Sequence, residues 1–301
     1  MALEKFKKSK FRKSTADVIT KANSIIAAYQ AMGFSLTLRQ LYYQFVARGL
    51  LPNKQQNYKR LGEIVNNARL AGLIDWNAIE DRTRNVRQIA MWSSPQSILD
   101  AVAEQYAENP WDTQEYQPEV WIEKDALVGV IEPICSRMRV PYFACRGYTS
   151  QSEQYRAGKR FAATLRAKKR PLVLHLGDHD PSGLDMTRDN GDRLRMFARK
   201  GVVVKRLALN MDQVEQYNPP PNPAKESDSR FEGYRASYGD ESWELDALDP
   251  PVIEKLIQDA LDEIIDTSAW DSVMSREEAN KADLEAVAQR WADVSEYLRD
   301  Q

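Results

Sequence analysis

The stretch GDHDPSG, residues 177–183, brings two carboxylates within one residue of each other. Asp178 and Asp180 follow the apolar run PLVLHL, and a helical pattern starts near Pro181, so both lie where a strand ends and a turn begins. A third carboxylate, Glu123, ends an earlier apolar run in WIEKDAL. Clustered carboxylates repel each other unless a cation binds between them, and oxygen ligands suit a hard ion such as Mg²⁺. These three residues are the candidate metal ligands.

The position of the acids favours a site, although a purely structural role stays open. In open parallel sheets, ligands bind beyond the carboxyl ends of the strands, and a divalent ion there would bind or polarise phosphate oxygens. Alternate residues at a strand end can point the same way, which suits the spacing of Asp178 and Asp180. The alternative is that Asp180 caps a helix and Asp178 pairs with a nearby Lys or Arg.

Two adjacent tyrosines in RQLYYQ, residues 39–44, are the second feature that could do chemistry. At about 100° per residue, Tyr42 falls near the middle of an apolar helix face, whereas Tyr43 lies on its flank, one turn from Arg39. A free tyrosine has a pKa of about 10 and is a poor nucleophile, but a neighbouring guanidinium favours its phenolate. Tyr43 could thus attack a phosphodiester held by Arg39; two tyrosines that only pack are the alternative.

Four apolar strands alternate with helical patterns through the middle of the chain. This alternation predicts an α/β fold with a parallel sheet that is covered by helices on both faces. The expected strands are residues 118–123, 140–147, 171–177 and 201–209. Beyond them, a proline-rich polar stretch leads to two acidic helical patterns.

Residues 14–91 read as helices followed by a polar, arginine-bearing stretch. Three short helices in this order are typical of a winged-helix domain, which commonly places its third helix in the DNA major groove; an ordinary three-helix packing unit is the alternative. Capping patterns predict helix starts at three places in the chain: Thr37 with Gln40, Asn53 with Gln56, and Ser275 with Glu278.

Charge is distributed unevenly along the 301 residues. Residues 1–92 carry 16 Lys and Arg against 6 Asp and Glu, a charge of +10, whereas residues 211–301 carry 8 against 23, a charge of −15. A basic front end suits nucleic acid, although it can also be a solvated surface. The candidate phosphate contacts are Arg60, Arg69, Arg82, Arg84 and Arg146.

Several functional classes are disfavoured by what the sequence lacks. No apolar run is long enough to cross a membrane, and the two cysteines make neither a disulfide framework nor a zinc pattern. These features indicate a cytoplasmic protein, associated with the nucleoid if bacterial or from a phage. The sequence contains no Walker A motif, so we expect no bound nucleotide and no ATP hydrolysis.

The motifs VWIEKDAL and GDHDPSG together resemble a Toprim domain, the metal-binding fold shared by topoisomerases, bacterial primases and some nucleases. The form of both motifs is similar to the A subunit of topoisomerase VI and its relative, the meiotic double-strand-break protein. In that family a winged-helix domain precedes the Toprim domain and carries a nucleophilic tyrosine, which RQLYYQ matches at Tyr43. The likeness covers roughly residues 14–210, with Gln40 where the family usually has Asp.

This resemblance implies a domain order and an activity. The expected parts are a winged-helix domain at 1–92, a linker at 93–117, a Toprim domain at 118–215 and a helical, acidic C-terminal extension at 216–301. The chain would cleave double-stranded DNA by tyrosine transesterification, as a short topoisomerase A-subunit-like enzyme. Mg²⁺ would be the cofactor, with Mn²⁺ or Ca²⁺ able to replace it.

The resemblance also implies partners. Tyrosine and metal come from different subunits of a homodimer in this family, so the active sites would be composite, and Tyr43, Arg39 and Glu123 would be the catalytic residues. Strand passage would need a separate ATPase subunit. Two other functions stay open: a Toprim hydrolytic nuclease that uses the acids alone, and a DNA-binding dimer without catalysis that bridges duplexes.

Overall fold

The computed structural model describes residues 3–79, 89–199 and 201–300. Within these ranges, no helix is both long enough and apolar enough to cross a membrane. The chain divides into two compact units, and each is assembled from two segments that are far apart in the sequence.

The first unit comprises residues 1–84 and 118–260, and the second comprises residues 85–117 and 261–301. This division differs from the expected domain boundaries. The expected linker is largely helical and belongs to the second unit, and the expected C-terminal extension is split between the two units.

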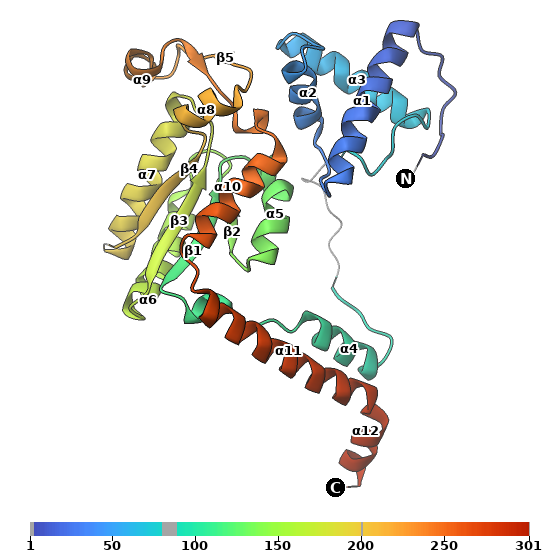
Figure 1. The fold of residues 1–301 in the computed structure, drawn as a ribbon, viewed down its shortest axis with the longest axis vertical. Coiled ribbons are helices and arrows are strands. Elements are labelled where there is room, and N and C mark those ends of the chain that lie inside the picture. The colour runs from blue at the N-terminus through green and yellow to red at the C-terminus, as the bar shows by residue number, and fades with distance from the viewer. Residues whose placement is uncertain (1–2, 80–88, 200, 301) are drawn as a thin grey trace. The chain divides into compact units, whose positions relative to one another are not determined.

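A four-stranded parallel sheet forms the centre of the first unit, in the order β2-β1-β3-β4 (Figure 1). The mixed α/β fold predicted from the alternating pattern is therefore confirmed. The strands that carry Glu123 and Asp178 are neighbours, since the main-chain nitrogen of Glu123 donates to the Leu176 carbonyl at 2.8 Å. The strands are β1 (Tyr116–Ile122), β2 (Tyr142–Ala144), β3 (Arg170–Leu176) and β4 (Val203–Ala208).

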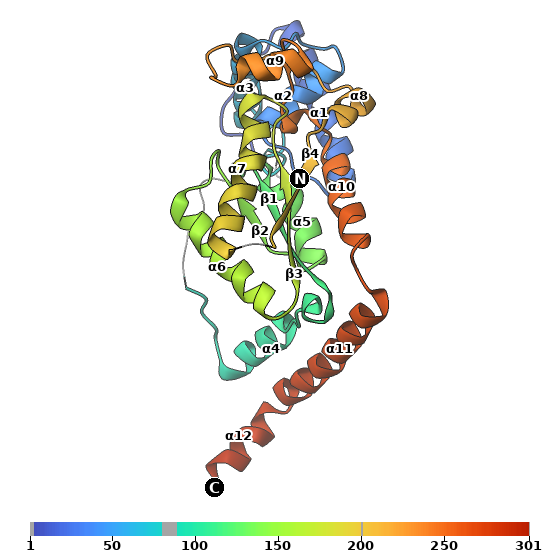
Figure 2. The same cartoon turned by 90° about the vertical axis from the view of Figure 1, so that its left-hand side faces the viewer.

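Helices cover both faces of this sheet, as Figures 1 and 2 show from two directions. One face is covered by α6 (Gln151–Arg166) and α7 (Pro181–Ala198), and the other by α5 (Val128–Arg137) and α10 (Pro250–Asp262). The strands are apolar because both faces are buried, which explains their near-continuous hydrophobic runs. Buried side chains from strands and helices form the core on the first face: Trp121, Phe161, Val173 and Leu194.

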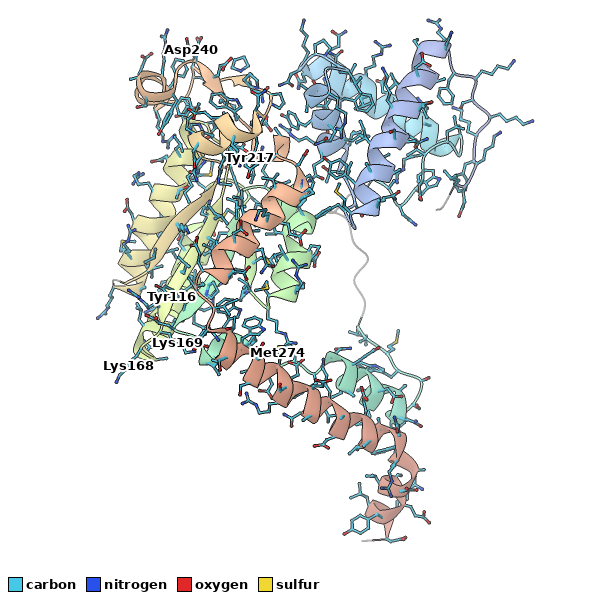
Figure 3. The ribbon with its side chains drawn as sticks, in the orientation of Figure 1. Tyr116, Lys168, Lys169, Tyr217, Asp240 and Met274 are labelled. Atoms are coloured by element: carbon cyan, nitrogen blue, oxygen red, sulfur yellow. The ribbon has the colours of Figure 1, made fainter. Side chains whose placement is uncertain are left out.

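The proline-rich stretch after β4 is folded and lies next to the turn that carries the two aspartates. It contains α8 (Met211–Tyr217), α9 (Phe231–Tyr238) and a short antiparallel ladder of β5 (Asn222–Pro223) and β6 (Glu241–Ser242). We call residues 218–246 the flanking segment. His179 joins it to the aspartate turn, because its main chain exchanges hydrogen bonds of 2.8 and 2.9 Å with Trp243. In Figure 3, Asp240 of this segment lies at the opposite end of the sheet domain from Lys168 and Lys169, which precede β3.

Three helices form the N-terminal part of the first unit: α1 (Lys13–Ala31), α2 (Leu38–Ala47) and α3 (Gln55–Leu70). Their inner faces share one apolar core, which includes Tyr42, as the helical periodicity predicts. The capping box of Thr37 and Gln40 is confirmed. The predicted cap at Asn53 is wrong: α3 begins at Gln55, and the Asn53 amide instead donates to Asn222 Oδ1 at 2.7 Å.

The second unit is helical and consists of α4 (Pro95–Gln105), the 3₁₀ turn Pro110–Thr113, α11 (Thr267–Gln289) and α12 (Trp291–Arg299). Trp111 from the first segment packs edge-to-face on Trp270 of α11, with ring centroids 5.5 Å apart. The predicted helix start at Ser275 is wrong, because α11 begins eight residues earlier, where Asp266 accepts a hydrogen bond from the Ala269 nitrogen.

Candidate functional site

Glu123 is held where β1 ends, in a buried position beside the aspartate turn. Its side chain is 8% exposed, and its Oε2 accepts a hydrogen bond from the main-chain nitrogen of Asp178 at 2.9 Å. Gly177 makes this approach feasible, because a Cβ there would lie 2.8 Å from Glu123 Oε2. Burial raises the pKa of Glu123, while the Asp178 amide and the Lys124 ammonium oppose that rise.

Asp178 lies just after the end of β3 and is also buried, at 7% exposed. Its Oδ1 accepts from the main-chain nitrogen of Leu245 at 2.8 Å, and its Oδ2 is 2.8 Å from Lys124 Nζ. Burial raises the pKa of Asp178 to about 7, against the pull of Lys124 and with a further push from Glu123. Asp178 therefore holds a proton more readily than an exposed aspartate does.

Asp180 combines a structural role with exposure to the site. Its Oδ1 accepts from the Gly183 nitrogen at 2.6 Å and from the Ser182 hydroxyl at 2.9 Å, so it caps α7 as the structural alternative predicts. Gly183 is required for this tight turn, because a Cβ would come within 2.2 Å of the Asp178 carbonyl oxygen. Asp180 also lines the same cavity as Asp178 and Glu123.

Lys124 is the cation at the centre of this acid cluster, and the sequence did not identify it as a site residue. Its Nζ lies 2.8 Å from Asp178, 2.9 Å from Glu244 and 2.8 Å from Asp246. Burial alone would lower the pKa of Lys124, but the three carboxylates reverse the effect and hold it above its usual range. The acid site therefore already contains one bound positive charge.

The three candidate metal ligands line one cavity of about 360 Å³, together with Arg39 and Lys124. The flanking segment supplies further walls from Asn222, Ser242, Trp243 and Glu244. The sequence did not identify this wall as part of a site. Its alternate acids, Glu244 and Asp246, were the available signal.

Tyr43 lies in an adjoining cavity of about 250 Å³, and Arg39, Asn222 and Glu244 line both cavities. The sequence placed Tyr43 on a helix flank reaching outward, whereas the structure leaves it only 4% exposed. Burial and the Glu244 carboxylate raise its pKa to about 12, although Arg39 and Asn222 act in the opposite direction. The phenol is consequently neutral at physiological pH in this conformation.

Arg39 lines both cavities. Its guanidinium carbon lies 5.8 Å from the centre of the Tyr43 ring. Its Nε is 2.9 Å from Asp246 Oδ2, and its Nη2 pairs with Glu244. These two acids hold Arg39 beside the phenol. They also neutralise the positive charge of Arg39, so a phosphate would have to compete with them to bind it.

The donor set can be tested against a divalent cation. Glu123, Asp178 and Asp180 offer only oxygen atoms and line one cavity, which fits a hard ion such as Mg²⁺. In the part of the chain that the structure describes, however, no three His, Cys, Asp or Glu side chains form a ready-made ligand group. Asp178 is paired with Lys124 and Asp180 with the first turn of α7, so a cation would have to compete with these contacts.

The arginines predicted to contact phosphate occupy different environments. Arg60 is exposed on α3, and Arg146 is exposed but 3.1 Å from Asp125. Arg69 packs over the Trp76 ring at 4.6 Å and donates to the Trp76 carbonyl, so it is already used within the N-terminal helices. Arg82 and Arg84 lie outside the described residues.

Neither histidine lines the acid cavity. His175 Nδ1 is 2.8 Å from the Thr187 hydroxyl, and His179 Nδ1 is 2.9 Å from the Tyr234 hydroxyl. Burial lowers the pKa of His175 to about 3 and that of His179 to about 4, so both are neutral and structural.

In comparisons with known proteins, no family model matches this sequence and no curated protein matches it.

Proposed function

We propose that this protein cleaves duplex DNA by metal-dependent tyrosine transesterification, as an A-subunit-like member of the topoisomerase VI type. One observation carries the proposal: the cavity that contains Tyr43 and the cavity that contains Glu123, Asp178 and Asp180 share walls, with Arg39 between them. A nucleophile, a phosphate-binding cation and a hard-metal donor set are the three components that this reaction requires.

In this mechanism Tyr43 supplies the attacking oxygen. A bond forms from its phenolic oxygen to phosphorus, and the bond from phosphorus to one deoxyribose oxygen breaks. The phenol loses its proton, and the departing sugar oxygen gains one. Because one phosphodiester replaces another, the reverse reaction can reseal the strand.

Arg39 would orient the phosphate beside the phenol and favour the phenolate. Glu123, Asp178 and Asp180 would hold Mg²⁺, which when bound withdraws charge from the phosphate oxygens. Lys124 keeps the acids together before a cation arrives, because it balances Asp178 at 2.8 Å. Its release toward Glu244 and Asp246 would free Asp178 for coordination.

The N-terminal helices are proposed to act as a winged-helix DNA-binding domain. Two observations support this: the basic charge of residues 1–92, and the exposure of Arg60 on α3, the helix expected to enter the groove. Arg146 would add a phosphate contact at the carboxyl end of the sheet. Because the two cavities share walls within one chain, we propose that each subunit of a homodimer supplies both Tyr43 and the acids of its site, in place of the composite site that the resemblance implies. A separate ATPase subunit would serve strand passage.

A hydrolytic nuclease is the second candidate, and the environment of Tyr43 favours it. A phenol that is 4% exposed, with a pKa raised by burial to about 12, is a poor nucleophile as it stands. The carboxylates could then bind a metal that activates water instead.

A covalent-adduct assay separates these functions. The full chain is incubated with supercoiled plasmid and Mg²⁺ or Mn²⁺, quenched with detergent and digested, and DNA-linked peptide is measured. We expect an adduct that Tyr43→Phe abolishes and that Tyr58→Phe preserves, since Tyr58 lines the same cavity. Nicked DNA without adduct, unaffected by Tyr43→Phe, would instead establish the nuclease. Tight duplex binding with no product under either metal would leave a bridging dimer.

A further inference from the structure

Arg206 is a cation that binds the main chain of the aspartate turn rather than the carboxylates of the acid cluster. It belongs to β4, next to the strand that ends at the aspartates, and it is partly buried. Its six hydrogen bonds go to main-chain carbonyls and one hydroxyl, and none goes to a carboxylate. A guanidinium used in this way organises the backbone, because its planar donors have fixed directions.

The carbonyls that Arg206 binds lie on both sides of Asp180. Its Nη2 donates to Gly177 at 3.1 Å and to Asp178 at 2.6 Å, and its Nη1 donates to Gly183 at 2.9 Å. One rigid group therefore fixes the start and the end of the turn that presents both aspartates.

Two further contacts anchor Arg206 itself. Its Nε and Nη2 donate to the Leu209 carbonyl at 3.2 and 3.0 Å, and its Nη1 donates to the Thr187 hydroxyl at 2.8 Å. The anchor thus connects the end of β4 and the second turn of α7 to the aspartate turn. Desolvation lowers the pKa of Arg206 to about 10, and Glu123, Asp178 and Asp180 oppose that change, so the group stays charged at neutral pH.

We propose that Arg206 is a positioning residue for the metal site, which sets the geometry of Asp178 and Asp180 and thereby the affinity for a divalent cation. This inference rests on the proposed function for the identity of the site. Groups that orient metal ligands typically change metal affinity by about 10- to 100-fold when they are substituted. The charge of Arg206 also favours the ionised form of Glu123, which follows β1, the strand on the other side of β3 from β4.

A lysine at position 206 separates geometry from charge. Arg206→Lys keeps the positive charge, but one ammonium with three donors cannot reach carbonyls on both sides of Asp180. Arg193→Lys is the matched control, because Arg193 lies on α7 and pairs at 2.9 Å with Asp189, within its own helix. Circular dichroism and thermal melting establish that each variant is folded.

The measurement is Mn²⁺ binding by the full chain without DNA, followed by the electron paramagnetic resonance signal of the free ion. We expect Arg206→Lys to weaken binding by about 10- to 100-fold and Arg193→Lys to leave it unchanged. In the adduct assay, Arg206→Lys should need correspondingly more Mn²⁺ but should recover most of the wild-type yield at saturation. A role in overall stability alone would not produce this metal-dependent recovery.

The outcomes distinguish the inference from the proposed function. If folded Arg206→Lys binds Mn²⁺ within twofold of wild type, Arg206 is not a positioning residue, whatever the adduct assay shows. Arg206-dependent Mn²⁺ binding without any adduct would support the inference and overturn the transesterase. Failure of the wild-type chain to bind Mn²⁺ would overturn both.

Discussion

Asp178 and Tyr43 are almost equally buried, at 7% and 4% exposed, and burial raises the pKa of both, but the cations and main-chain donors around them differ. Asp178 has a lysine at 2.8 Å, a main-chain amide at 2.8 Å and the guanidinium of Arg206 beneath its turn. Tyr43 has one arginine nearby, and two acids, Glu244 and Asp246, that raise its pKa.

The difference shows where the proposed reaction is controlled. The carboxylate site gives Asp178 a lysine and a main-chain donor that oppose the rise in its pKa, and a divalent cation would have to displace a proton and outcompete Lys124 there. The phenol site disfavours charge, because the acids that bind Arg39 also repel a phenolate. Activation of Tyr43 therefore requires Glu244 and Asp246 to be neutralised or moved, for instance when Arg39 transfers to a phosphate.

The largest expected effect on adduct formation comes from removing the Asp178 carboxylate. Asp178→Ala should lower the rate of adduct formation by at least about 1,000-fold, because both a metal ligand and the partner of Lys124 are lost. Quenched time courses with plasmid and Mg²⁺ measure this rate. Asp192→Ala, at an exposed residue of α7, is the control and should retain wild-type activity. An active Asp178→Ala protein would rule out this carboxylate as a ligand.

A smaller effect is expected at Tyr43, where a substitution should increase the rate of adduct formation. Glu244→Gln removes the acid that most strongly raises the pKa of Tyr43, so the phenolate should form at lower pH. We expect the pH–rate profile of adduct formation to shift toward acid by about one pH unit, which is about a tenfold gain on its rising limb. Glu241→Gln changes an exposed acid of the same segment and should leave the profile in place. A shift toward alkaline pH would mean that Glu244 helps the phenol rather than opposing it.

The pH dependence of stability provides a test of the Asp178 site without DNA. The folded-state pKa of Asp178 is about 7, above its unfolded value, so the folded protein binds the extra proton and loses stability as pH rises toward 7. In chelator, we expect the free energy of unfolding to fall by roughly 2 kcal/mol between about pH 4 and about pH 7 because of this group. Asp178→Asn should flatten that part of the curve, and Asp192→Asn should not. A difference in unfolding free energy between wild type and Asp178→Asn that rises across this window would contradict the assigned direction.

The smallest effect concerns cations outside both sites. Arg39 and Lys124 are already neutralised by acids, so attraction to DNA must come from elsewhere. Among the described residues, Lys7, Lys8 and Lys10 are exposed and form no ion pair. Changing all three to Gln should reduce the slope of log affinity against log salt by about 2 to 3, because each phosphate contact contributes about 0.9.

Duplex binding measured by fluorescence anisotropy at several salt concentrations gives this slope. The matched control changes Lys159, Lys168 and Lys169 to Gln; the last two lie at the far end of the sheet domain from the flanking segment (Figure 3). Equal slopes for the two triple variants would show that the N-terminal lysines do not contact phosphate.

Local sequence patterns predicted two features of the fold: the sheet edge that carries the acids, and the start of the helix that carries Tyr43. Alternation of apolar strands and helices predicted that Glu123 and Asp178 lie at the same edge of the sheet, because parallel strands end at the same edge. It left open whether their strands are neighbours, which the strand order shows. The capping box of Thr37 was predictable because both of its residues belong to one helical turn.

Contacts between distant segments could not be predicted in this way. Lys124 meets Glu244 and Asp246 across about 120 residues of sequence, and no periodicity encodes that encounter. The surroundings of Tyr43 likewise include Asn222, which belongs to the flanking segment and lines the same cavity. The pattern at Ser275 misled because Ser-x-x-Glu also occurs in the interior of a helix, where apolar packing decides and the capping groups are not needed.

The second unit is assembled from two distant segments of the sequence, which has a consequence for its folding during synthesis. Helix α4 emerges from the ribosome about 160 residues before the α11 residues that it packs against. During that interval Ala103 and Trp111 lack the α11 surface that later covers them, so the nascent chain exposes an apolar stretch until α11 is synthesised.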